Sequence, residues 1–259
     1  MRSVVITALG LFVGFISSVS SFAAALVQNV QGDVRAGATA ATATAARNGQ
    51  RVEMGAVITT GAKSLVMLRF DDGQAVVLNE NAEFRITNYS FVRDDPKKDV
   101  FLFDLFKGAL RVVTGVVNTR YAQAYALRTP QGTIGIRGTD FMVAVVNPAF
   151  LRVLNGAIGV SNSAGAVTFA AGTTGMVASA TALATTIAFT ALPAAVAASF
   201  SQLGALAITA GVGVAGAGVA TGAGLGGVTL GTIGVIGAAV AGVAAVASQK
   251  DQSQTTGTR

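Results

Sequence analysis

Apolar and polar residues alternate through short runs in the first two thirds of the chain, and this pattern predicts β-strands. Two such runs, Ser64–Phe70 and Gln74–Glu80, are separated by the letters DDG. An Asp-Gly pair between two alternating runs is a strong signal for a β-hairpin. We therefore expect a turn at Asp72 and Gly73, followed by a third strand in Glu83–Val92, where the alternation continues.

The later runs of this region have the same texture. Asp99–Phe106 carries aromatic residues on both faces, which predicts a strand that is covered on both sides. Gly108–Val117 and Phe141–Val146 place β-branched residues between glycines, and such residues favour strands. Helix signals are almost absent before residue 175. We therefore predict an all-β domain over residues 26–175.

One stretch of this domain leaves two structures open. Arg35–Gln50 is rich in alanine and threonine, and alanine favours a helix. The interleaved threonines and the absence of a capping residue favour a loop or an edge strand instead.

The start of the chain has the layout of a secretory signal peptide. Arg2 supplies a positive charge, Val4–Ile16 is an apolar run, and the small residues that follow fit cleavage after Ala23 or after Ala25. The alternative is an uncleaved membrane anchor, although the apolar run is short for a span. We expect residues 1–25 to be removed and the protein to be exported to the periplasm or cell envelope of a bacterium.

Charge is distributed very unevenly along the rest of the chain. Residues 26–152 carry 15 basic and 11 acidic residues, whereas residues 153–249 carry none. A soluble domain normally has about a quarter of its residues charged. The two parts are therefore expected to lie in different surroundings.

The uncharged part ends in a tract, residues 176–247, that is rich in glycine and alanine. Its last stretch, Val228–Ala247, is long enough to cross a bilayer as a helix, and a polar tail, residues 248–259, follows it. Glycines recur at four-residue spacing, as in Gly218 and Gly222, so helices could approach closely and oligomerise. A disordered tail is the alternative, but disorder usually goes with low hydrophobicity and high charge. We expect a helical tract associated with membrane lipid.

The composition restricts the chemistry. The chain has no cysteine and no histidine, so it has no thiol nucleophile, no Ser–His pair and no His/Cys site for zinc or haem. We expect no catalytic, cofactor-binding or metal-binding residues, and a hydrolase that relies on carboxylates is the remaining enzymatic alternative. The net charge of +6 suits anionic envelope components, but acidic and basic residues are interspersed, so we expect no nucleic-acid partner.

The stretch RTPQGTIGIRGTDF, residues 128–141, has the densest motif. Its glycines do not match the dinucleotide-binding fingerprint, and the P-loop sequence is absent. Pro130 favours an extended residue before it, as at the start of a strand. Arg137 could lie across neighbouring strands and bond carbonyls or a carboxylate such as Asp140. The residues to which we assign a structural role here are Thr129, Pro130, Gly132, Gly135, Arg137, Gly138, Thr139, Asp140 and Phe141.

Four segments together resemble the FecR domain: Gly32–Val34, Asn48–Ile86, Phe106–Gly115 and Leu127–Val143. In that family a Gly-Asp step, an Asp-Gly hairpin, a strand of the form L-x-x-G-x-x-R and a final T-P-x-x-x-x-x-x-R-G-T-x-F recur in this order. The third element contains Gly108 and Arg111, which are therefore structural candidates with Asp72 and Gly73. The resemblance covers about residues 27–146.

The resemblance implies a periplasmic, non-enzymatic, mainly β domain like a twisted β-solenoid. In the family's iron-uptake regulators this domain relays a signal from an outer-membrane transducer to a sigma factor. Those regulators begin with a cytoplasmic segment and a membrane helix, and a charged domain follows their FecR domain. This chain has a signal peptide and an uncharged tract in those places. We therefore expect a membrane-tethered binding or scaffolding module whose partner is an envelope protein or glycan. The alternatives are an oligomeric envelope protein and a component of sigma-factor signalling.

Overall fold

The computed structural model describes residues 23–114 and 122–208, except for the side chains of Ala23, Ala122 and Arg137. This part of the chain is mainly β, and its strands join in one 15-stranded sheet. The strands are β1 (Ala23–Gln31), β2 (Val34–Gly37), β3 (Thr44–Ala45), β4 (Arg51–Glu53), β5 (Val57–Thr60), β6 (Leu65–Phe70), β7 (Ala75–Leu78), β8 (Glu83–Ser90), β9 (Val100–Val113), β10 (Tyr125–Thr129), β11 (Gly132–Val145), β12 (Ala149–Asn162), β13 (Gly165–Ala170), β14 (Thr174–Val177) and β15 (Thr185–Ile187). Helix α2 spans Ala194–Gly204, and short 3-10 helices span Pro96–Lys98, Ala122–Ala124 and Phe189–Ala191.

Three long strands divide the sheet into two facing layers. The first half of β9 pairs with β8 and β10, and its second half pairs with β7 and β11. The long strands β11 and β12 are divided in the same way. The first layer therefore runs β15-β14-β12-β11-β9-β7-β6-β1-β4, and the second runs β13-β12-β11-β10-β9-β8-β5-β2-β3. Rings from the two layers meet between them, as where Phe70 of β6 lies 5.3 Å from Phe103 of β9, centroid to centroid.

Each long strand has a glycine with positive φ where it passes from one layer to the other. These glycines are Gly108 in β9, Gly138 in β11 and Gly156 in β12, with φ values of 86°, 61° and 75°. Glycine adopts such angles without the steric cost that a Cβ atom brings. A Cβ atom on Gly108 would also lie 2.4 Å from the Cα atom of Ala82, so the bend there leaves no space for a side chain.

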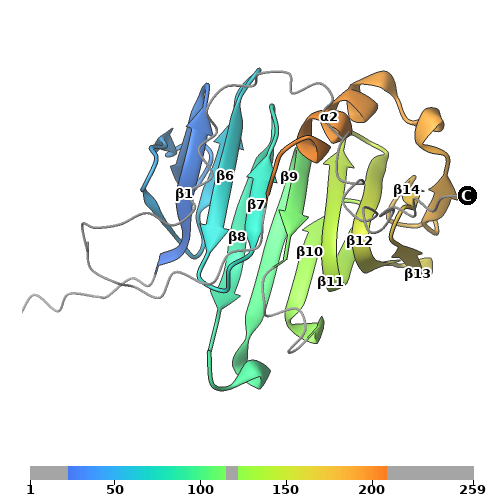
Figure 1. Cartoon of the computed structure of the whole chain (residues 1–259), viewed down its shortest axis with the longest axis horizontal. Helices are drawn as coiled ribbons and strands as arrows, with labels where there is room; N and C mark the ends of the chain where they lie inside the picture. The colour runs from blue at the N-terminus through green and yellow to red at the C-terminus, as the bar shows by residue number, and fades with distance from the viewer. Residues whose placement is uncertain (1–22, 115–121, 209–259) are drawn as a thin grey trace, which may run out of the picture. The chain divides into compact units, whose positions relative to one another are not determined.

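Two hydrophobic clusters account for the alternation in the strands. In β6, Val66, Leu68 and Phe70 face the core between the layers, whereas Leu65 and Met67 face the opposite side. That opposite side is covered by α2, which Figure 1 shows lying against the sheet near β9 and β11. Both faces of the first layer are therefore buried. For this reason all four residues of β7 are buried and apolar.

Several expectations from the sequence can be compared with this fold. The hairpin around Gly73 is confirmed, because β6 and β7 pair antiparallel on either side of it. Residues 35–50 contain most of β2, the whole of β3 and turns, rather than a helix. β14 spans residue 175, where we placed the domain boundary, and the fold continues through α2 because the outer face of the first layer needs a cover.

The segments expected to contact the membrane are mostly outside this description. Residues 1–22 of the expected signal peptide, residues 1–25, and the whole of residues 209–259, with the expected span at 228–247, lie outside the described residues. Among the described residues, no helix has the length and hydrophobicity needed to cross a bilayer.

Candidate functional site

An ion pair joins the two middle strands of the first layer. The Nε atom of Arg111 donates to Oδ1 of Asp140 at 2.9 Å, and its Nη2 atom donates to Oδ2 at 2.7 Å. The side chains of Arg111 and Asp140 are 8% and 20% exposed. Register brings them together, because Met142 of β11 lies opposite Arg111 of β9, so Asp140 is on the same face two residues away. Paired hydrogen bonds of this kind are among the stronger polar contacts in proteins.

The remaining nitrogen of Arg111 binds the end of helix α2. Nη1 donates to the carbonyl oxygens of Leu203 at 2.9 Å, Leu206 at 2.8 Å and Gly204 at 3.4 Å. The last carbonyls of a helix lack partners within the helix and carry partial negative charge. The guanidinium of Arg111 donates hydrogen bonds to these carbonyls, and its positive charge lies beside their partial negative charge. We call Arg111, Asp140 and these three carbonyls the helix clamp.

Apolar contacts also hold α2 against the sheet, beside the helix clamp. Val196, Phe200 and Leu203 of α2 are buried against the outer face of the first layer. The residues of that face are Leu65, Met67, Val77, Ala109, Met142, Ala144 and Phe150. The described fold therefore uses the FecR-like motif to hold α2, which lies within the C-terminal tract.

Around the helix clamp, neighbouring motif residues fix the bend of β11. The backbone N–H of Thr139 donates to Oγ1 of Thr114 at 3.0 Å, and the Thr139 carbonyl accepts from the N–H and hydroxyl of Thr114. Gly138 supplies the positive φ next to it. Phe141 is fully buried in the core. The side chain of Arg137 lies outside the described atoms, and the carboxylate proposed for it, Asp140, is held by Arg111.

The beginning of the motif forms the turn between β10 and β11. The hydroxyl of Thr129 donates to the carbonyl of Gly132 at 3.0 Å, and Pro130 occupies the turn between them. A Cβ atom on Gly132 would lie 2.8 Å from the Ser161 carbonyl oxygen, which explains the glycine. At Gly135 a Cβ atom would meet nothing closer than 4.0 Å, so packing does not explain that glycine.

The hairpin aspartate belongs to a buried polar group that the sequence did not suggest. Asp72 is 3% exposed, and its carboxylate accepts from the N–H of Gln74 at 3.2 Å and the hydroxyl of Tyr89 at 3.3 Å. Burial raises the pKa of Asp72 to about 6, more than these hydrogen bonds lower it. The nearby hydroxyl of Tyr125 is buried and has no hydrogen-bond partner among the described residues, and burial raises its pKa above the usual value. Only the tertiary structure assembles this group, because its members come from three separate segments.

A second carboxylate lies on the outer face of the second layer. Asp104 accepts from Nε and Nη2 of Arg128 at 2.6 and 2.9 Å, and from the hydroxyl of Thr87. Burial alone would raise the pKa of Asp104, but the hydrogen bonds from Arg128 and Thr87 outweigh burial and lower it. The Arg128 side chain is 47% exposed, so the arginine of this pair is much more exposed to water than Arg111 of the helix clamp, which is 8% exposed.

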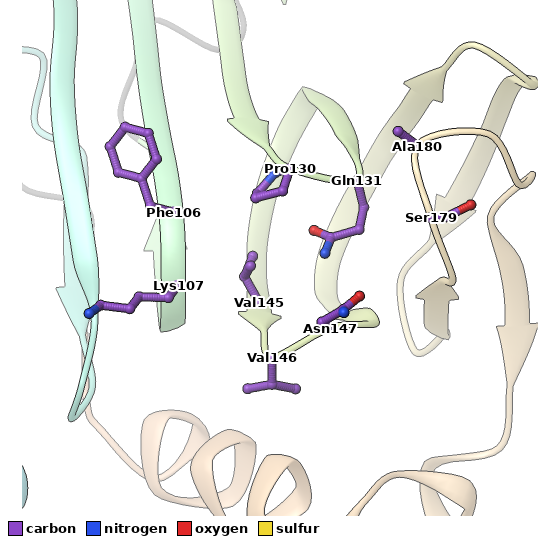
Figure 2. Close-up of a pocket in the computed structure, with 9 residues that line it drawn as sticks. All are labelled: Phe106, Lys107, Pro130, Gln131, Val145, Val146, Asn147, Ser179 and Ala180. Atoms are coloured by element: carbon purple, nitrogen blue, oxygen red, sulfur yellow. The ribbon is translucent and has the colours of Figure 1, made fainter.

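An open groove of about 560 Å³ lies at the rim between the layers. Figure 2 shows Phe106 and Lys107 of β9 on one side of it and Ser179 on the other. Phe106 and Val146 are 39% and 54% exposed, which is unusual for large apolar side chains. Gln131 is buried beside them, and within the described part of the chain its Oε1 atom has no hydrogen-bond partner. The lining is completed by Pro130, Val145, Asn147 and Ala180.

The chemistry available at these places is limited. Across residues 23–114 and 122–208, no three His, Cys, Asp or Glu side chains are close enough to hold a metal ion together. Asp72, Asp104 and Asp140 each lie in a different part of the fold and are engaged by hydrogen-bond donors. The side chains of the helix clamp make their contacts within the protein, whereas the groove is open to solvent.

Comparison with known proteins finds a family model that matches part of this chain. Residues 56–159 match the family model described as "FecR protein". Two crystal structures of a "putative anti-sigma factor" from Parabacteroides distasonis ATCC 8503 are similar to this chain, with 15% identity and TM-scores of 0.40 and 0.41. Each match covers 51% of this chain and 58% of the other, so the chain spans less than two thirds of those proteins. No curated protein matches the sequence.

The family match coincides with the motif residues described above. Gly73 and Gly108 lie within residues 56–159, and so do both members of the ion pair in the helix clamp. The resemblance expected from the motifs is thus confirmed: residues 56–159 of this chain are a FecR domain.

Proposed function

We propose that this protein is an exported, non-enzymatic FecR-domain module of the bacterial cell envelope, and that its β domain holds a membrane-associated C-terminal tract in place. The observation that carries the proposal is the helix clamp. Arg111, which Asp140 holds in place, binds the end of α2 four residues before the tract leaves the described part of the chain, and both residues belong to the FecR-like motif. Such an arrangement serves anchoring, since both side chains are fully used by contacts within the protein.

The second part of the proposal concerns the tract itself. Residues 209–249 carry no charge, and Val228–Ala247 has the length of a membrane span. Glycine and alanine are only weakly lipophilic, so small faces on neighbouring helices would support insertion. The β domain, with its two layers, would then stand at the membrane surface and bind an envelope protein or glycan. The groove beside Phe106 is the surface we assign to that partner.

Fractionation of cells that produce the full chain tests the tether. A matched chain that ends at residue 208 keeps every described element, including α2. We expect the full chain to stay with membranes after an alkaline wash and the shorter chain to appear in the soluble periplasmic fraction. Recovery of the full chain in that soluble fraction would refute the tether. Recovery of both chains in the cytoplasm, with the first 25 residues intact, would refute export.

A second candidate function follows from the family match. A FecR domain at residues 56–159 favours a part in transmembrane signalling to a sigma factor. Co-purification from detergent-solubilised envelopes distinguishes the two candidates. An outer-membrane transducer captured with the full chain supports signalling, whereas capture of structural envelope proteins or glycan supports the scaffolding role.

A further inference from the structure

The last strand of the second layer, β13, has a free edge. It pairs with β12 over six consecutive residues, without a bulge. Within the described ranges no strand pairs with its other side, and Figure 1 shows β13 at the edge of the sheet. An open edge strand presents unpaired N–H and C=O groups and is a template for pairing with another chain.

Most natural edge strands are protected, and the opposite end of this molecule follows that rule. There, β3 is only two residues long, and β4 carries Arg51 and Glu53, both exposed. By contrast, β13 reads GAVTFA and has no charge and no proline. The absence of charge extends from residue 153 to residue 249. The two ends of the sheet therefore differ in the features that prevent edge-to-edge association.

The hairpin geometry shows which groups of β13 point outward. Asn162 and Gly165 face each other across a two-residue turn, so they form the first hydrogen-bonded pair. Alternation then directs the backbone groups of Val167 toward β12 and those of Ala166 and Thr168 away from it. No hydrogen bond is made by the outward groups of these last two residues among the described segments.

Neighbouring segments cover only the ends of β13. The loop at Ala180 bonds the hairpin turn, where its carbonyl accepts from the N–H of Ser163 at 3.2 Å. At the far end, the carbonyl of Ala170 accepts from the N–H and hydroxyl of Thr173. Between these contacts, Ala166 and Thr168 are exposed. The middle of the strand is therefore open to a partner.

We propose that β13 pairs antiparallel with β13 of a second copy, so that the protein is a symmetric dimer with a continuous second layer. A two-fold axis makes such an edge self-complementary, because the backbone N–H groups of each copy then face the carbonyl groups of the same edge in the other copy. The copies carry a net charge of +6 each, but none of it lies on this strand, so the edge is the place where repulsion between them is weakest. The outward-facing residues Ala166, Thr168 and Ala170 are small, so no bulky side chain blocks the approach.

The test compares two substitutions at one position in the full chain, purified in detergent. Thr168→Pro removes the outward backbone N–H and adds a ring at the edge. Thr168→Val keeps the backbone N–H and replaces the threonine side chain with one of equal size. Proline is tolerated at edge positions whose N–H faces away from the sheet. We expect sedimentation to give a dimer for the parent and for Thr168→Val, and a monomer for Thr168→Pro with an unchanged far-ultraviolet circular dichroism spectrum.

A third variant, Thr168→Lys, covers the possibility that proline disturbs folding. It leaves the backbone intact but sets two like charges near each other across the proposed axis, so we expect a monomer. A monomeric parent would overturn the proposal. So would a dimer that persists in both Thr168→Pro and Thr168→Lys, because association would then come from the C-terminal tract. Since the tether test uses membrane fractionation and this one uses oligomeric state, either can fail alone.

Discussion

At the scale of single residues, one guanidinium connects three parts of the chain. Arg111 comes from β9, Asp140 from β11, and the carbonyl of Leu203 from α2. Burying two charges is costly, and a buried pair is often no more stabilising than apolar residues of the same shape. Removing one member, however, leaves the other charge buried and unpaired. The helix clamp should therefore be sensitive to substitution even though its net contribution to stability is modest.

The first prediction concerns that sensitivity. We expect Arg111→Ala to lower the free energy of unfolding by about 3–5 kcal/mol, because Asp140 and the carbonyls at the end of α2 lose their partner. Denaturant unfolding followed by circular dichroism measures it. Arg128→Ala is the matched control: the Arg128 side chain is 47% exposed, and Asp104 keeps its hydrogen bond from Thr87, so a loss of only about 1 kcal/mol is expected. Equal losses in the two variants would contradict a buried clamp.

The second prediction concerns Asp72 and pH. Its pKa is about 6 in the folded protein against 3.8 for the ordinary side chain, so the folded state holds this proton more tightly. The free energy of unfolding should therefore fall as pH rises from about 4 to 6 and then level off, with a change of about 3 kcal/mol from this group.

Other carboxylates titrate in the same range, and the low pKa of Asp104 acts in the opposite direction. The measurement is therefore the difference in unfolding free energy between the parent and Asp72→Asn at pH 4, 5, 6 and 7. The parent should lose stability relative to the variant as pH rises. A difference independent of pH would show that the carboxyl is not buried as the fold places it.

At the scale of elements, the long strands β9, β11 and β12 set the architecture, since each contributes to both layers. Each bends at a glycine, but the bends are not equivalent. Gly108 has positive φ and no space for a Cβ atom, whereas Gly138 has positive φ and open space around it. A side chain at Gly138 would therefore meet backbone strain alone, whereas a side chain at Gly108 would meet backbone strain and a steric clash.

The third prediction uses that separation. Gly138→Ala should cost about 1–2 kcal/mol, which is the penalty of a Cβ atom in the left-handed region. Gly108→Ala should cost clearly more, because the new methyl group would overlap the backbone of Ala82, which cannot move away as a flexible side chain would. Thermal unfolding of the two variants side by side provides the comparison. A smaller loss at Gly108 than at Gly138 would mean that the bend of β9 is not as tight as described.

At the scale of the whole molecule, the first layer is buried on both faces and the second on one. The inner faces make a common core, and α2 completes the second cluster over the outer face of the first layer. The fold thus extends beyond the residues matched to the FecR family, because the helix that covers this face lies at residues 194–204. The end at β13 is left open, which leads to the proposed dimer.

Much of the fold was determined by the sequence alone, wherever the signal is local. Alternation of apolar residues depends only on neighbours two positions apart, so the strands were predictable, and turn chemistry at Gly73 predicted the hairpin. The structural roles assigned to Gly108 and Gly138 also follow from a local property, the freedom of glycine to adopt positive φ.

The tertiary structure alone decided which distant residues meet. The sequence suggested Arg137 as the arginine beside Asp140, because the two are three residues apart. The register between β9 and β11 places Arg111 beside Asp140, 29 residues away, and Arg111 also meets the end of α2, 92 residues further along the chain. Pairing across such separations depends on how layers stack and which faces they bury, and periodicity within one segment carries no information about either.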